Sequence, residues 1–169
     1  MVNKASVIDT NVLKVANNGG SHDPGCVRKC VRRLRHIRDH ESVVIDNQWL
    51  ILREYDGKLN QSGQPGVGDA FYKWVLTNQG NPQRCVMVDI NPTDTSRLNF
   101  SEFPKTKALE RFDPDDRKFV AAAIVAGCPV LVALDTDWWQ ARRALEDARV
   151  KLEFICEAEV AQLAGRRRR

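Results

Sequence analysis

The stretch ASVIDTN, residues 5–11, is the starting point for interpreting this chain. Val7 and Ile8 predict a short buried strand, and an acidic turn at residues 9–11 ends it before a helical segment begins at Val12. An aspartate at the carboxyl end of a core strand lies at the sheet edge where α/β proteins bind ligands. Asp, Thr and Asn are also the residues that cap helices, so the stretch taken alone favours a simple cap.

Size and composition are those of one globular domain. The chain has 169 residues, of which 43% are hydrophobic and 28% charged, which suffices for a full hydrophobic core. We predict one domain over residues 1–165 and a basic, solvated tail, Arg166–Arg169. The tail supplies four of the 26 basic residues, so the body carries 22 basic and 22 acidic residues. Nucleic acid would therefore be attracted by local basic patches or by the tail.

The expected location follows from hydropathy and cysteine usage. No apolar run approaches the roughly 18 residues of a membrane span, and the amino terminus lacks the apolar region of a signal peptide. We therefore predict a cytoplasmic protein with no membrane partner. The five cysteines are interpreted as small buried hydrophobes in a reducing compartment. Cys26 and Cys30 follow His22 closely, but no second pair follows at finger spacing, so the sequence does not favour zinc.

Strands and helices are expected to alternate along the chain. After the first strand, strands are predicted at residues 41–45, 85–90, 129–134 and 151–156. Helices are predicted at residues 12–16, from residue 24 onward, and at 47–59, 69–77, 117–126, 138–147 and 157–164. This βα repeat predicts an α/β fold of three layers (αβα), in which a five-stranded parallel sheet lies between two layers of helices. The long polar connection at 91–114 has the length of a functional loop or an insertion, and we expect Phe100 and Phe103 to anchor it.

Acidic residues recur where these elements begin or end. Asp9 and Asp135 end strands, Asp116 begins a helix on the same face as Phe119, and Glu54 lies in the helix after the second strand. Each acid can be explained singly as a cap or an exposed helix residue. Four carboxylates gathered together repel one another and need a compensating cation. Their hard oxygen ligands suit Mg²⁺ or Mn²⁺, which activate water for attack on a phosphodiester.

One predicted helix carries a basic face. Residues 27–38 include six Lys and Arg side chains and no acidic one. A solvated surface explains this pattern in isolation. Beside a nuclease site, the same face could contact phosphates, and we select Arg28, Arg32 and Arg35 as candidate substrate contacts.

In their order along the chain, these motifs resemble those of PIN-domain nucleases over residues 5–156. The family opens with a strand ending in D-T-N, as at residues 7–11, and carries a glutamate in the next helix, as in LREY at 52–55. Its third motif is an aspartate heading a helix with an apolar residue at +3, as in DRKFVAAA from Asp116. Its last motif is D-x-D after a buried strand, matched by Asp135–Asp137 before a tryptophan.

The resemblance implies a divalent-metal endonuclease, most often acting on RNA. The implied catalytic and metal-binding acids are Asp9, Glu54, Asp116 and Asp135. Asp137 would bind a second metal ion or act from outside the first shell of metal ligands. Asn11 would hold Asp9 or the substrate by hydrogen bonding. The chain departs from the family at Ala133, where Ser or Thr is common, which removes a hydroxyl group but no ligand.

Three functions remain open on the sequence. The first is a ribonuclease that acts as a toxin, a processing enzyme or a defence effector. Its candidate partners are an antitoxin or a defence-system protein, and a homo-oligomer is a candidate assembly. The second is a DNA-directed nuclease, because the same metal chemistry cuts either polymer. The third, least favoured, is a nucleic-acid-binding or protein-binding module without turnover, because none of the four carboxylates is missing.

Overall fold

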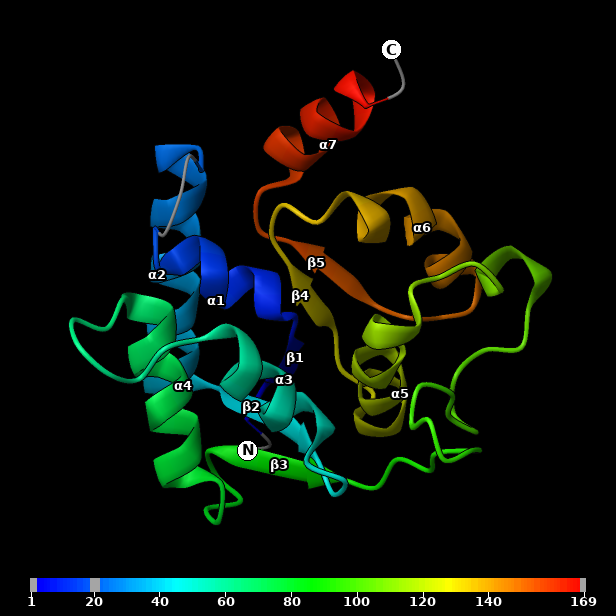
Figure 1. Cartoon of the computed structure of the whole chain (residues 1–169), viewed down its shortest axis with the longest axis horizontal. Helices are drawn as coiled ribbons and strands as arrows, with labels where there is room; N and C mark the ends of the chain where they lie inside the picture. The colour runs from blue at the N-terminus through cyan, green and yellow to red at the C-terminus, as the bar shows by residue number, and fades with distance from the viewer. Residues whose placement is uncertain (1–2, 19–21, 168–169) are drawn as a thin grey trace.

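Five parallel strands form one sheet at the centre of the molecule (Figure 1). The computed structural model describes residues 3–18 and 22–167. The strands are β1 (Ala5–Ile8), β2 (Ser42–Asp46), β3 (Cys85–Val88), β4 (Val130–Val132) and β5 (Leu152–Phe154). Their order across the sheet is β3-β2-β1-β4-β5, and every neighbouring pair is parallel. The predicted α/β fold with a five-stranded parallel sheet is confirmed.

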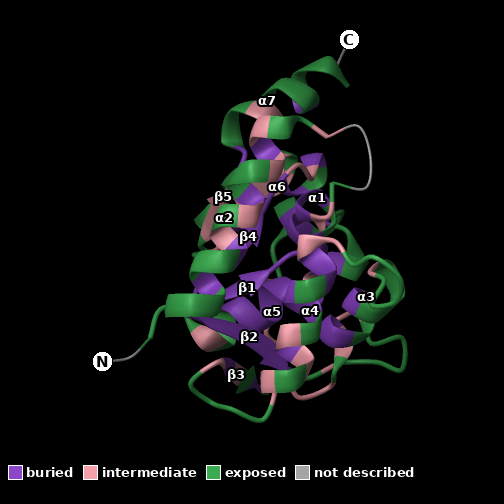
Figure 2. Cartoon of the chain, turned by 90° about the vertical axis from the view of Figure 1, so that its left-hand side faces the viewer, coloured by how far each residue is buried: buried purple, intermediate pink, exposed green. Residues whose placement is uncertain are grey.

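Helices cover both faces of this sheet. Those in the described residues are α1 (Thr10–Ala16), α2 (Pro24–His40), α3 (Leu50–Lys58), α4 (Val67–Asn78), α5 (Arg117–Ala126), α6 (Thr136–Asp147) and α7 (Glu157–Arg166). The first four lie on one side of the strands, and α5 and α6 lie on the other side (Figure 1). Buried residues concentrate along the strands and on the helix faces that cover them (Figure 2). None of the described helices is long and apolar enough to cross a bilayer.

The sheet changes its direction of growth between β1 and β4. The chain adds β2 and then β3 on one side of β1, and then returns to place β4 and β5 on the other side. At such a point the connections leave the sheet toward opposite faces, and a crevice opens beyond the carboxyl ends of the strands. The residues that directly follow β1 and β4 therefore border this crevice.

Helix α2 shows how the local sequence determines an element. Its N-cap is Asp23, whose side-chain oxygen accepts a hydrogen bond from the backbone N–H of Cys26 at 3.0 Å, and Pro24 occupies the first turn. Four residues at helical spacing are buried on one side: Cys26, Cys30, Leu34 and Ile37. The predicted start of this helix is confirmed.

Helix α3 begins three residues later than its pattern predicts, at Leu50. The cause is Asp46, whose buried carboxylate accepts hydrogen bonds from the backbone N–H groups of Gln48, Leu50 and Ile51. These bonds hold a tight turn in which Trp49 adopts a left-handed conformation, with φ of 61°. Asp46 therefore has the capping role that its position suggests, although the helix starts beyond it.

The long connection between β3 and α5 is anchored by aromatic side chains. Phe100 and Phe103 are buried, as predicted, and Phe103 stacks on Phe112 with ring centroids 5.9 Å apart. The guanidinium group of Arg117 lies over the Phe103 ring, 5.1 Å from its centroid. This connection includes a short 3₁₀ turn at Lys107–Leu109. It therefore packs on the body instead of extending into solvent.

The last helix extends into the predicted basic tail. Helix α7 continues to Arg166, two residues past its predicted end. The guanidinium group of Arg167 donates a hydrogen bond to the hydroxyl oxygen of Thr136 at 2.7 Å. Arg166 and Arg167 are both exposed, and the long side chain of Arg167 reaches the neighbouring helix α6. Residues 168–169 lie outside the described part of the chain.

The cysteine prediction is correct for burial and wrong for bonding. All five cysteine side chains are buried, as expected for small hydrophobes. Cys26 and Cys156, however, form a disulfide with their Cα atoms 5.5 Å apart. They meet because the first turn of α2 packs against the segment that joins β5 to α7, a contact between positions separated by 130 residues.

Candidate active site

Asp9 and Asp135 follow the two strands that border the crevice, β1 and β4. Asp9 is 2% exposed. Each also caps the helix that comes next. Asp9 accepts a hydrogen bond from the backbone N–H of Asn11 at 3.2 Å, and Asp135 accepts one from that of Asp137 at 2.9 Å. Capping and membership of a shared acidic site are therefore compatible for both residues.

Asp116 is different, because its side chain does not cap a helix. It lies between a 3₁₀ turn (Pro114–Asp116) and α5, and it makes no side-chain hydrogen bond to the first turn of α5. Its side chain is buried, whereas the neighbouring Asp115 is exposed. The expectation that Asp116 lies on the same face as the buried Phe119 agrees with this geometry. A cap does not explain why a carboxylate is buried at this point.

Glu54 lies in the second turn of α3, with its side chain only 9% exposed. The hydroxyl group of Thr10 on α1 donates to its Oε1 atom at 2.7 Å, and the ammonium group of Lys58 lies 3.0 Å from the same oxygen. Its other oxygen pairs with the ammonium group of Lys118 on α5. These bonds connect three helices at the carboxyl edge of the sheet.

The acids influence one another electrostatically. Burial raises the pKa of Asp9 well above its usual range, and the charges of Asp116, Asp135 and Glu54 raise it further. Burial also raises the pKa of Asp116, to about 8, with Asp135 the largest contributor among the neighbouring charges. The pKa of Asp135 is raised too, mainly by burial. Because the charges of Asp135 and Glu54 raise the pKa of both Asp9 and Asp116, the four acids belong to one electrostatic site.

Glu54 has the opposite shift. Burial alone would raise its pKa, but the charge of Lys118 and hydrogen bonds from Lys118, Thr10 and Lys58 outweigh that effect and hold it below its usual range. Glu54 is therefore ionised and compensated by the protein itself. The three aspartates lack an equivalent cationic partner among the salt bridges of the described residues.

The spacing of the acids fits a partly hydrated ion. Within residues 3–18 and 22–167, no three acidic side chains bring their oxygens all within 4.8 Å of one another. The oxygens of the four predicted acids are therefore not gathered as tightly as the ligands of a fully dehydrated ion. Mg²⁺ commonly keeps several waters and binds through one or two carboxylates, so the hard oxygen donors and their mutual repulsion suit it.

The supporting residues take more specific positions than the sequence indicates. The side-chain oxygen of Asn11 accepts a hydrogen bond from the backbone N–H of Leu134 at 2.7 Å, which ties the end of β1 to the end of β4. Only its backbone N–H contacts Asp9. Asp137 is exposed in the first turn of α6. It lies beside Asp135 and contributes to the raised pKa of that residue.

The three candidate arginines lie apart from this site. Arg28, Arg32 and Arg35 are exposed on α2 and are not among the main contributors to the shifted pKa values of the aspartates described above. Arg33 on the same helix instead pairs with Glu153 and Glu41, at 2.8 and 2.9 Å. The basic face is thus partly engaged within the fold, and a role of the exposed arginines in substrate binding stays a prediction.

The structure adds residues that the sequence analysis does not select. Thr10 and Lys118 contact Glu54 directly, and the buried hydroxyl group of Tyr55 donates to the carbonyl oxygen of Ile8 at the end of β1. Lys58 could have been found, because it lies four residues after Glu54 on a helix. Lys118 could not, since its partner is 64 positions away along the chain.

A hollow of about 470 Å³ adjoins the acidic residues. It is lined by Asp113 and Asp137, whose charges raise the pKa of Asp135, although none of the four acids lines it. Arg111 and Gln140 supply groups that can donate hydrogen bonds. Phe112 contributes an aromatic ring. Donors and an aromatic surface next to carboxylates offer room for a nucleotide beside the candidate metal ligands.

Comparison with known proteins adds little to this geometry. No protein-family model and no curated protein matches the chain. Among solved structures, the chain is similar to the crystal structure of VapBC2 from Rickettsia felis bound to a DNA fragment from their promoter. The TM-score is 0.44 at 13% sequence identity, and the alignment covers 89% of this chain and 98% of that chain. A similarity of this size does not transfer an activity, so a functional argument has to rest on the site itself.

Proposed function

We propose that this protein is a divalent-metal-dependent nuclease that hydrolyses RNA phosphodiesters. The observation that carries the proposal is that Asp9 and Asp116 are buried, and Asp135 half-buried, in one site. There Asp116 and Asp135 raise the pKa of Asp9, and Asp135 raises that of Asp116. They come from three separate elements, so local helix capping does not account for their convergence. Buried like charges destabilise a fold unless a cation compensates them. A site in which carboxylates repel one another in the absence of a cation is suited to bind a metal ion.

The residues that would hold Mg²⁺ or Mn²⁺ are Asp9, Asp116 and Asp135, with Glu54 at the border of the site. A bound ion of this kind supplies positive charge at a phosphate oxygen and lowers the pKa of a water molecule. The chain's own residues position these ligands. Asn11 fixes the spacing of the two strand ends, and Thr10 and Lys118 orient Glu54.

The substrate assignment rests on the resemblance of the motifs to PIN-domain nucleases and on the surface around the acids. The hollow lined by Arg111 and Gln140 would receive a nucleotide next to Asp137. Arg28, Arg32 and Arg35 would contact phosphates farther along the strand, which predicts binding that weakens with salt. An antitoxin or defence-system partner and a homo-oligomer remain predictions from the sequence.

The test is cleavage of matched single-stranded RNA and DNA in Mn²⁺, in Mg²⁺ and in EDTA. We expect cleavage of RNA that depends on the metal. The cleavage rate should fall more than about 100-fold in Asp116→Asn, which exceeds the usual cost of losing a group that only supports a ligand. Asp115→Asn is the matched control, because Asp115 is adjacent in sequence but exposed. This control should cleave RNA at the wild-type rate.

Each alternative gives a distinct result. Cleavage of DNA alone would replace the substrate while leaving the metal site in place. Cleavage that continues in EDTA, or equally in Asp116→Asn, would remove the acidic site from the mechanism. A folded protein that binds RNA but does not cut it in either metal would support the binding module instead.

A further inference from the structure

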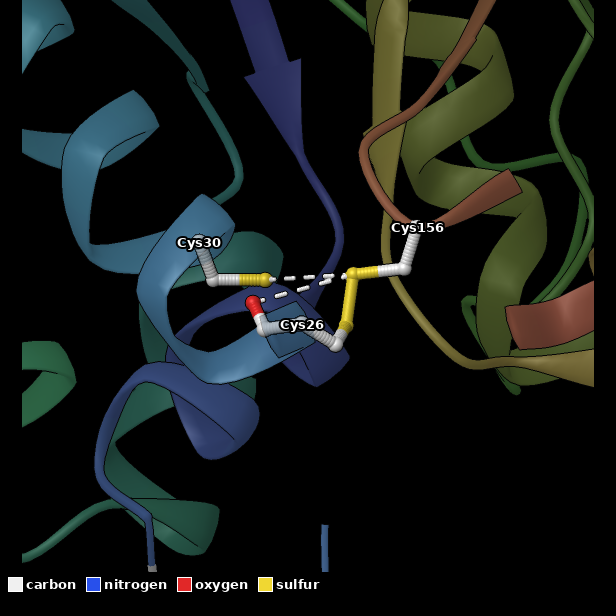
Figure 3. Close-up of side chains that lie close together, drawn as sticks. All are labelled: Cys26, Cys30 and Cys156. Atoms are coloured by element: carbon white, nitrogen blue, oxygen red, sulfur yellow. Dashed lines mark hydrogen bonds between the residues drawn. A yellow bond between two sulfur atoms is a disulfide. The ribbon is translucent and has the colours of Figure 1, made fainter. Parts of the chain in front are cut away.

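A second cluster of potential ligands lies away from the acidic site. The sulfur atoms of Cys26, Cys30 and Cys156 all lie within 4.8 Å of one another, and each of these side chains is fully buried (Figure 3). Within the described residues, it is the one group of three His, Cys, Asp or Glu side chains that meets so closely. The Sγ atom of Cys30 is 4.0 Å from that of Cys156.

Two helices direct their amino-terminal ends toward these sulfurs. Cys26 and Cys30 lie one turn apart at the start of α2, which has 17 residues, and Cys156 is the N-cap of α7, which has ten. The amino-terminal end of a helix carries partial positive charge and favours an anion there. Burial and the charge of Glu159 nevertheless raise the pKa of the Cys30 thiol to about 12, so a bound cation is needed to stabilise the thiolate, the form of cysteine that binds metals.

Glu159 adds an oxygen donor with no assigned role. Its Oε1 atom pairs with the ammonium group of Lys29 at 2.8 Å, whereas its Oε2 atom is buried and has no hydrogen-bond partner in the described residues. Next to burial, the charge of Glu159 is the largest contributor to the raised pKa of Cys30, so the carboxylate lies near that residue, although neither of its oxygens is within 4.8 Å of all three sulfurs. A buried carboxylate oxygen without a partner is costly unless a ligand satisfies it.

We propose that the reduced chain binds one Zn²⁺-type ion through Cys26, Cys30 and Cys156, with the Glu159 carboxylate as fourth ligand. The disulfide between Cys26 and Cys156 is then the oxidised, metal-free form of the same site. A phosphine reduces its S–S bond with two electrons and is oxidised to the phosphine oxide, while one water molecule supplies the oxygen of that oxide and the two protons of the two thiols. The three thiols then lose three protons to solvent as three sulfur–metal bonds form.

The observed geometry suits this ligand set. Thiolates bound to one tetrahedral zinc ion at the usual bond length lie about 3.8 Å apart. Cys30 and Cys156 already have nearly this separation, at 4.0 Å between their Sγ atoms. Cys26 is one helical turn from Cys30 and reaches the same point from α2. Lys29 offsets part of the negative charge that three thiolates and a carboxylate bring together.

The experiment titrates the full chain, reduced with a phosphine under anaerobic conditions, with Co²⁺ and then with Zn²⁺. We expect one equivalent of Co²⁺ to bind with thiolate-to-cobalt charge-transfer absorption, and Zn²⁺ to displace it. Cys30→Ser should weaken Zn²⁺ binding more than about 100-fold, which exceeds the usual cost of losing a group that only supports a ligand. Glu159→Gln should weaken it about tenfold. Cys85→Ser, which removes another free buried thiol, should leave the affinity unchanged.

Two further controls keep the result interpretable. Cys30→Ser retains both disulfide-forming cysteines, so its oxidised form should show the wild-type circular dichroism spectrum. Asp9→Asn should retain the charge-transfer band, because the acidic site contains no sulfur, so the two sites are tested separately. The proposal is overturned if reduced wild type shows no charge-transfer band or if Cys30→Ser binds Zn²⁺ equally well. It is also overturned if reduction unfolds the chain and Zn²⁺ does not refold it.

Discussion

The ammonium group of Lys118 forms an ion pair with the carboxylate of Glu54 inside the acidic site, joining α5 to α3. Both side chains are largely shielded from solvent, with exposed fractions of 11% and 9%. Lys118 lowers the pKa of Glu54 and also opposes the rise in the pKa of Asp116. It therefore supplies part of the positive charge that a bound metal ion would provide.

Replacing Lys118 should destabilise the metal-free protein. Lys118→Gln leaves the buried Glu54 carboxylate without its main partner, so we expect the free energy of unfolding in EDTA to fall by about 1–3 kcal/mol. Added Mn²⁺ should recover part of the loss, because the ion restores positive charge beside the acids. Urea unfolding in EDTA and in Mn²⁺ measures both effects.

Lys58→Gln is the control, because Lys58 contacts the same oxygen of Glu54 but is 50% exposed. An exposed ion pair contributes at most about 1 kcal/mol, so this change should have the smaller effect. Equal losses for the two variants in EDTA would show that burial of the Lys118 pair has no energetic importance.

The elements and the positions of the acids were predictable because they depend on local pattern. A buried run followed by a capping residue predicts the strand before Asp9 and the helix that Asp9 caps, and the cap at Asp23 predicts the start of α2. Gly127, in a left-handed conformation with φ of 64°, ends α5. Alternation of strands and helices was sufficient to predict a parallel sheet. Helical periodicity was sufficient to distinguish the buried Asp116 from the exposed Asp115.

The contacts made by these elements were not predictable in the same way. Three of these contacts join residues that are far apart in the chain: the hydrogen bond between Asn11 and Leu134, the ion pair between Lys118 and Glu54, and the disulfide between Cys26 and Cys156. Periodicity identifies which face of an element is buried, but it does not identify the partner on the facing element. The delayed start of α3 has a related cause, because three backbone donors around one Asp46 carboxylate outweigh helix propensity.

Asp9→Asn should stabilise the metal-free protein while removing its activity. The Asp9 carboxylate is buried among other acids, so a neutral side chain of the same shape removes repulsion and should raise the free energy of unfolding in EDTA by about 1–3 kcal/mol. Stabilisation by Mn²⁺ should shrink in this variant, because a ligand is lost. Thermal unfolding with and without Mn²⁺ measures both changes.

Asp46→Asn provides the contrast at equal burial. Asp46 accepts three backbone hydrogen bonds through its two oxygens, and the amide cannot accept at its nitrogen, so this variant should lose about 1–3 kcal/mol. A shift of the same sign in Asp9→Asn and Asp46→Asn would show that Asp9 is a structural cap and not a site of stored repulsion.

Stability of the metal-free protein should fall as pH rises between about pH 5 and pH 8. The pKa of Asp116 is raised from 3.8 to about 8 in the folded protein, so across this window the folded state binds a proton that the unfolded state has released. Raising the pH removes that proton and its contribution to stability. The raised pKa values of Asp9 and Asp135 act in the same direction.

Asp116→Asn should flatten this pH dependence, because its amide does not titrate. Glu54 does not compensate across the window, since its pKa is lowered and its contribution is lost only at more acidic pH. Urea midpoints in EDTA across the pH range provide the measurement. Stability that rises from pH 5 to pH 8 by about the same amount in both proteins would contradict the electrostatic description of the site.

Tyr55→Phe should weaken both the fold and the metal site. The buried Tyr55 hydroxyl group donates to the carbonyl oxygen of Ile8, the last residue of β1, directly before Asp9. Removing that donor should cost about 1–1.5 kcal/mol of unfolding free energy and loosen the backbone that positions Asp9. Calorimetric titration with Mn²⁺ should therefore show weaker binding, although Tyr55 is not a ligand.

Tyr72→Phe is the matched control for this change. Tyr72 is also buried and its ring packs edge-on against that of Tyr55, with centroids 5.8 Å apart. Its hydroxyl group donates over longer distances, 3.4 Å to the carbonyl oxygen of Leu52 and 3.2 Å to Asp56, away from β1. Tyr72→Phe should thus lose less stability and leave Mn²⁺ affinity unchanged. If both variants weaken Mn²⁺ binding equally, general loosening of the α3–α4 packing controls the site, and the Tyr55 bond to β1 has no special role.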